Sequence, residues 1–200
     1  MEFTSFLQKK LGFHSPYEIE ELIIDHMFEE LIVFSLDQRK ALEQYTSLVH
    51  LSLNNNGISK LDNFPSLINL RILEINHNKI KGNDLKMIRL NYSNLYKLKI
   101  SNNLIQRIEC FSALSNSNLV KLEVKFNPFT QTNPNYIQDL FKLLPSIKVI
   151  DGQDMNNQIV DTTNYEEEEE EENSNDELKD EEEEEEYDED DDDNDNEIDN

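Results

Sequence analysis

The sequence predicts an α/β fold: a right-handed leucine-rich-repeat solenoid with a parallel concave sheet, helical N- and C-terminal caps and a disordered acidic tail. Three observations predict it. A leucine-rich template recurs four times in a fixed phase, and helix signals flank the repeats. Nearly all of the net charge of −25 falls in the last segment of the chain.

The four repeats share the template L-x-x-L-x-L-x-x-N-x-I, with a spacing of 22, 25 and 24 residues between successive asparagines. That spacing lies within the ~20–29 residues of leucine-rich repeats. Each short strand would point its leucines inward and their neighbours outward, and stacked repeats would bury a continuous core. The apolar positions are Leu48, Leu51, Leu53 and Ile58; Leu70, Leu73, Ile75 and Ile80; Leu95, Leu98, Ile100 and Ile105; and Leu119, Leu122, Val124 and Phe129.

Asn56, Asn78, Asn103 and Asn127 hold the asparagine position of the template. A side-chain amide both donates and accepts, so it can bond backbone groups of adjacent turns that would otherwise be buried unpaired. An Asn-rich composition alone would not place the residue at the same phase four times. We therefore expect a structural asparagine ladder, and we expect the neighbouring Asn102 to face solvent and to be replaceable by alanine.

The N-terminal cap is expected over about residues 1–18. A short amphipathic helix is predicted from about Thr4 to Leu11, and Ser15-Pro16-Tyr17-Glu18 has the pattern of a capping box. The segment from Ile19 to Ile24 then matches the start of the template. Met27 stands where asparagine is expected, so the ladder should begin one repeat later.

The repeats should extend over about residues 19–130, and a C-terminal cap over about 131–161. Within that cap, Tyr136 to Leu144 has apolar residues at helical spacing, and Pro145 should end the helix. A truncated last strand and a turn at Gly152 should follow. Such covers are needed because an open solenoid end would expose core leucines.

Residues 162–200 form a Glu/Asp-rich tail in this division. The 36 residues 165–200 hold 25 acidic residues and one lysine, a net charge of −24, whereas residues 1–164 have a net charge of −1. So few apolar residues predict disorder. The tail either keeps the protein soluble or binds basic proteins as a polyanion, and it argues against direct binding of nucleic acid. Representative acidic positions are Glu166, Glu170, Glu172, Glu181, Glu186, Asp190 and Asp193.

The polar strand positions beside the leucines form the expected concave face, which solenoids commonly use for partners. The alternative is a merely solvated polar surface. The cations among these residues give one end of the face a basic bias. The residues are His50, Ser52, Asn54, Glu74, Asn76, Lys97, Lys99, Ser101, Lys121, Glu123 and Lys125.

Catalytic, metal and cofactor sites are not expected. The four histidines are scattered, no metal-ligand spacing unites them, and His77 is interpreted as a turn residue. Cys110 is the single cysteine and cannot form an internal disulfide, which favours an intracellular location. Neither a signal peptide nor an apolar run long enough for a membrane span is recognised.

Two hydroxyl residues of the tail region, Thr163 and Ser174, precede acidic residues by three positions. An acidophilic kinase would accept either residue. A phosphate there would add about −2 to a segment that is already negative, and so would modulate affinity rather than switch a fold.

The order of repeats, cap and acidic tail resembles the acidic leucine-rich nuclear phosphoprotein 32 family. The segments that carry the resemblance are Pro16 to Ile24, the four repeats, the cap stretch from Asp139 to Ile147, and Ile150-Asp151-Gly152. The cap motif alone is shared with a spliceosomal and a dynein-associated class of capped repeat proteins.

The resemblance implies a non-enzymatic regulator of chromatin and signalling. Members of the family bind histones, inhibit protein phosphatase 2A and take part in transcription, mRNA export and apoptosis. We therefore expect a monomer that binds histones or other basic proteins, in nucleus and cytoplasm, although no basic import signal is present near the C-terminus. The alternative is a scaffold in RNA processing or cytoskeletal assembly that uses the concave face alone.

Overall fold

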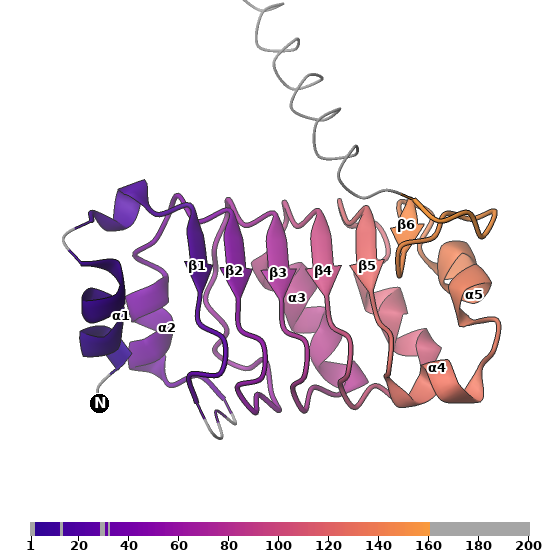
Figure 1. The fold of residues 1–200 in the computed structure, drawn as a ribbon, viewed down its shortest axis with the longest axis horizontal. Helices are drawn as coiled ribbons and strands as arrows, with labels where there is room; N and C mark the ends of the chain where they lie inside the picture. The colour runs from indigo at the N-terminus through magenta and orange to yellow at the C-terminus, as the bar shows by residue number, and fades with distance from the viewer. Residues whose placement is uncertain (1–2, 13, 29–30, 32, 161–200) are drawn as a thin grey trace, which may run out of the picture. The chain divides into compact units, whose positions relative to one another are not determined.

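The computed structural model describes residues 3–12, 14–28, 31 and 33–160. Within this part, six short parallel strands form one sheet in chain order, each paired with its sequence neighbours (Figure 1). This arrangement confirms the predicted leucine-rich-repeat solenoid. The strands are β1 (Glu21–Ile23), β2 (His50–Ser52), β3 (Ile72–Glu74), β4 (Lys97–Lys99), β5 (Lys121–Glu123) and β6 (Val149–Ile150).

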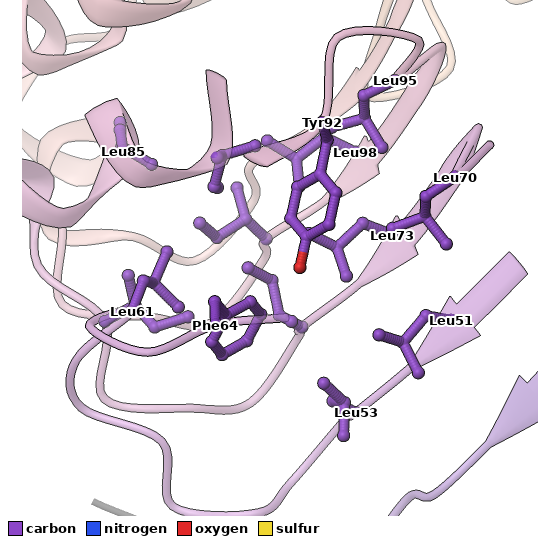
Figure 2. Packing of buried hydrophobic residues seen from close by; sticks show 14 of the residues in the cluster. Leu51, Leu53, Leu61, Phe64, Leu70, Leu73, Leu85, Tyr92, Leu95 and Leu98 are labelled. Atoms are coloured by element: carbon purple, nitrogen blue, oxygen red, sulfur yellow. The ribbon is translucent and has the colours of Figure 1, made fainter. Parts of the chain in front are cut away.

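The middle residue of each strand lies in register with the middle residue of its neighbour. This row consists of five leucines and Ile150, all at most 1% exposed. Figure 2 shows Leu51, Leu73 and Leu98 pointing from three strands into the same apolar layer, together with Tyr92 and Phe64. The core is therefore continuous from coil to coil, as stacked repeats require.

Helices and 3₁₀ turns connect the strands and cover the ends of the repeat stack. In Figure 1, α1 and α2 lie at the β1 end, α3 lies behind the central strands, and α4 and α5 lie at the β6 end. Local caps explain some of the boundaries: Ser15 and Ser35 each form a capping box with a residue three positions later. The elements are α1 (Phe3–Leu11), η1 (Pro16–Glu18), α2 (Leu36–Leu42), η2 (Gly82–Asp84), α3 (Leu85–Asn91), η3 (Ile108–Leu114), α4 (Pro128–Thr132) and α5 (Tyr136–Leu143).

The four template asparagines are buried and bridge successive coils. The Asn78 Oδ1 atom accepts from the N–H groups of Asn56 and Ile58, at 3.1 and 3.0 Å. Its Nδ2 donates at 3.0 Å to the carbonyl oxygens of Leu53 and Ile75. Asn103 repeats the pattern one coil later. Asn78, Asn103 and Asn127 thus satisfy buried backbone groups of two coils, their own and the preceding one.

The first coil has no ladder asparagine of its own, but it is bonded to the ladder by its backbone. Asn56 Oδ1 accepts from the N–H groups of Met27 and Phe28. At the C-terminal end an aspartate has the equivalent task. Asp151, 6% exposed, accepts from the Val124 N–H at 2.8 Å and from the Tyr136 hydroxyl at 2.7 Å. Through these two bonds Asp151 links Tyr136 of α5 to the last full repeat.

The residue before each ladder position lies in the left-handed region of backbone space. His26, Asn55, His77 and Asn102 all have φ of +55°. Asn and His are among the residues that tolerate this conformation best. Asn102 is exposed as expected, but the expectation that alanine would replace it harmlessly is wrong, since a residue with a Cβ and no polar side chain is strained there.

Residues 161–200 lie outside the described part of the chain, and with them the acidic tail positions and the two candidate phosphorylation sites, Thr163 and Ser174. Among the described residues, no helix is long and apolar enough to cross a bilayer.

The ladder generates a stability prediction. Asn103→Ala should lower the free energy of unfolding by about 1–3 kcal/mol, because one buried N–H loses its partner and three carbonyl groups each lose one of two donors. Urea unfolding followed by circular dichroism measures the change. The matched control is Asn102→Gly, which keeps the left-handed conformation accessible and should cost less than about 0.5 kcal/mol. Equal unfolding midpoints for the two variants would contradict the assigned role.

Candidate interaction surface

The concave face is defined here by the side chains that the strands and their C-terminal ends point away from the core. Strand register places them in rows that cross the sheet. The eleven residues predicted from sequence all lie in these rows. Four further members were not predicted: Glu21, Ile23, Asp25 and Ile72.

A chain of alternating charges crosses the face from β1 to β5. His50 Nδ1 lies 2.8 Å from Glu21 Oε1, and His50 Nε2 lies 3.4 Å from Glu74 Oε1, within ion-pair range but without hydrogen-bond angles. Lys99 Nζ lies 2.9 Å from the same Glu74 oxygen and 4.0 Å from Glu123 Oε1. The two central charges, Glu74 and Lys99, are therefore already paired within the domain.

These contacts shift the pKa values of His50 and Glu74. The Glu74 carboxylate, and secondarily Glu21, raises the pKa of His50 despite partial burial, which acts in the opposite direction. His50, Lys99 and Asn54 together lower the pKa of Glu74 to about 2. Both shifts favour the charged forms.

A second polar row runs along the C-terminal ends of the strands. Asp25 accepts from the Ser52 hydroxyl at 2.6 Å and from the Asn54 N–H at 2.8 Å. Asn54 Oδ1 accepts from the Asn76 N–H at 2.7 Å, and Asn76 Oδ1 from the Ser101 N–H at 2.8 Å. The polar groups of this row hold the strand ends together. Asp25 could have been found by aligning the first coil, because it follows Ile24 as Asn54 follows Leu53.

Two of the predicted face residues do not reach solvent, which corrects their expected exposure. Ser52 is 2% exposed because its small side chain lies within the Asp25–Asn54 network. Lys121 is 3% exposed, and its Nζ lies 5.4 Å from the centre of the Tyr96 ring. The guanidinium of Arg71 lies 5.5 Å from the same centre, so Tyr96 holds two cations by cation–π contact.

The polar groups of the face, among the described residues, bond mainly to one another. No group of three or more His, Cys, Asp or Glu side chains among the described residues could hold a metal ion. Serine, histidine and aspartate do meet at its N-terminal end, but the Ser52 hydroxyl donates to Asp25, and His50 binds Glu21 and Glu74 instead. What the arrangement offers is a firmly held polar surface whose most accessible charges are Glu21, Glu123 and Lys125.

Comparison with known proteins finds relatives of the repeat part of the chain; no family model matches. An acidic leucine-rich nuclear phosphoprotein 32-related protein of Plasmodium falciparum (isolate 3D7) is 37% identical over 140 residues, which cover 69% of this chain and 49% of that protein. The acidic leucine-rich nuclear phosphoprotein 32 family member A of Drosophila melanogaster is 36% identical over 150 residues, covering 72% and 52% of the two chains. The chain thus spans about half the length of these relatives.

Two other similarities extend the comparison. A protein of Tetrahymena thermophila that is named as a histone is 33% identical over 138 residues, covering 68% of this chain and 35% of that protein. Among solved structures, a chain of the Drosophila melanogaster SNF/U2A′ complex is similar with a TM-score of 0.51 at 22% identity, covering 80% of this chain and 87% of that one. At that identity the structural likeness supports the fold alone.

The charge chain predicts a pH-dependent stability. The raised pKa of His50 means that its contribution is complete below its ordinary value of 6.5 and is lost as the pH rises through the raised value. The lowered pKa of Glu74 acts oppositely: its contribution is present above 4.5 and is lost as the pH falls toward 2. The melting temperature of wild type should therefore exceed that of His50→Gln most near pH 5–6, by about 2–4 °C for ~1 kcal/mol, and the excess should shrink at higher pH.

Thermal unfolding of both proteins between pH 5 and 9 tests this expectation. His14→Gln is the control, because His14 is exposed and forms no ion pair within the described chain. A difference for His50→Gln that stays constant over this pH range would show that the imidazole acts by packing and not by charge.

Proposed function

The chain belongs, through its repeat domain, to the acidic leucine-rich nuclear phosphoprotein 32 family, and from this premise we propose that it binds histones and other basic proteins without catalysing a reaction. The observation that carries the proposal is the separation of charge along the sequence. Residues 165–200 have a net charge of −24, and residues 1–164 have a net charge of −1. The repeat domain therefore cannot neutralise the acidic segment, whereas a lysine- and arginine-rich partner can.

The geometry of the concave face supports the same assignment. Lys99 pairs with Glu74 and Glu123, and Lys121 is buried against Tyr96, so part of the basic bias of this face is not accessible to a partner. Glu21 and Glu123 keep accessible carboxylates at its two sides. In this proposal the acidic segment supplies long-range attraction, and the concave face makes a smaller, shape-dependent contact.

The relatives add support of two kinds. Their names place acidic, leucine-rich nuclear proteins in the same family. A related repeat sequence also occurs in a protein that is named as a histone. Nuclear and cytoplasmic residence, phosphorylation of Thr163 or Ser174, phosphatase inhibition, and roles in transcription, mRNA export or apoptosis are further proposals that follow from family membership.

Affinity for core histones is the decisive measurement. Binding of the full chain to an H3–H4 preparation should weaken steeply between about 0.1 and 0.5 M salt, since screening acts on long-range attraction. Removing residues 165–200 should weaken it at least tenfold, or about 1.4 kcal/mol. The melting curve of the shortened chain shows whether its domain is still folded.

A variant matched in length but not in charge sharpens the assay. Changing the glutamates of 166–172 and 181–186 to glutamine keeps the length of the segment and removes 13 negative charges; it should reproduce most of the loss. Glu123→Gln should affect only the weaker, salt-resistant remainder. Equal affinity of full and shortened chains at 0.15 M salt would contradict histone binding through the acidic segment, and salt-resistant binding to one partner would favour the scaffold alternative.

A further inference from the structure

The residues that precede the ladder positions, here called the turn row, have left-handed backbone and are otherwise histidine or asparagine. Phe126 is the exception. It occupies the position of Asn55, His77 and Asn102, with φ of +62°. A bulky residue in the left-handed region is a genuine outlier, because its Cβ lies too close to the following carbonyl oxygen. Its ring gains no burial in return, since the residue is 69% exposed. Backbone strain with an exposed aromatic side chain is an arrangement that folding alone does not favour.

Other apolar groups lie on the same edge of the solenoid. The backbone of residues 102–105 runs alongside that of 125–129, because Asn102 donates its N–H to the Lys125 carbonyl at 2.8 Å and Phe129 donates to Ile105 at 3.2 Å. Leu104, 44% exposed, therefore belongs to the coil next to Phe126. An apolar pair from adjacent coils is thus presented to solvent.

An open cavity of about 430 Å³ adjoins this pair. Leu104 and Pro128 line it together with Cys110, so it begins two residues beyond Phe126. Gly82 leaves the space that Cys110 fills, since a Cβ on Gly82 would lie 2.2 Å from the cysteine sulfur. One wall of the cavity is therefore formed by close packing between coils.

The two charged residues that line the cavity are both cationic. Lys81 and Arg107 line the cavity, and Lys125 precedes Phe126 in the chain. All three are exposed, and none forms an ion pair with a carboxylate within the described residues. A cavity that combines the apolar side chains of Leu104 and Pro128 with the cations Lys81 and Arg107 is complementary to a peptide that combines acidic residues with an apolar side chain.

We propose that Phe126, Leu104 and the adjoining cavity form a docking site for an acidic peptide segment of a partner protein. The partner's apolar side chain enters the cavity beside the Phe126 ring, and its carboxylates face Lys81, Arg107 and Lys125. Exposed aromatic anchors of this kind carry a large share of binding energy at interfaces. The site shares Lys125 with the concave face but is otherwise made of different residues, and it binds a partner of the opposite charge to a histone.

The test replaces Phe126 by a residue that relieves the backbone strain and removes the ring. Phe126→Asn installs the residue type that other coils use at this position, so the melting temperature should stay the same or rise. Binding of short fluorescein-labelled peptides, each with a varied apolar pair flanked by glutamates, should weaken about tenfold, as loss of an anchor predicts. Fluorescence anisotropy on the full chain at 0.15 M salt measures both proteins under the same conditions.

Two controls identify the interaction. Arg107→Gln should weaken acidic-peptide binding about threefold, whereas Arg89→Gln, an exposed arginine of α3 that does not line the cavity, should leave it unchanged. Peptides with lysine in place of glutamate report on the acidic segment and should bind Phe126→Asn as well as wild type. The proposal is overturned if acidic peptides do not bind, if Phe126→Asn binds them equally well, or if that variant melts at a lower temperature.

Discussion

The structure depends on the buried amide of one asparagine per coil. A solenoid turns its chain away from the sheet at every repeat, and at that turn backbone groups of two successive coils are removed from water. Asn78 accepts from Asn56 and Ile58 in one coil and donates to Ile75 in its own. The amide can bond all of these groups only when the two coils are in one relative position. Any other position would leave buried groups unpaired, at a cost of about 1–3 kcal/mol each. The ladder therefore fixes the register of the sheet.

Register in turn determines what the concave face can do. Neighbouring parallel strands lie about 4.8 Å apart, so charges in adjacent rows fall within ion-pair distance. The sequence Glu21, His50, Glu74, Lys99 and Glu123 becomes a continuous chain of alternating sign for this reason. A partner that bound to its centre would have to replace contacts that the domain already makes. Recognition by charge is consequently expected from the accessible ends of this network, Glu21 and Glu123, and from groups outside it.

Much of the fold could be predicted because its features repeat within a single coil. The strands, the ladder and the C-terminal helix follow from spacing alone, and the structure has α5 at Tyr136–Leu143. The concave face was predicted less well because its details depend on contacts between coils. Lys121 is buried against Tyr96, which belongs to the preceding coil and comes one residue before Lys97, the strand partner of Lys121. Asp25 was missed because the first coil has Met27 at the ladder position, so the full template was applied only from the next repeat onward.

The left-handed turn row was also hidden from the sequence, since two histidines and two asparagines share no single letter pattern. Once the row is known, Phe126 becomes its exception, and the ladder explains how the exception is tolerated. On one side of Phe126, Lys125 accepts from Asn102 and Val124 donates to Asp151. On the other side, Asn127 binds Ile105, Ile100 and Val124. These bonds fix the backbone before and after the residue, so the interactions that stabilise the solenoid also hold an aromatic ring out in solvent, where only a binding partner can bury it.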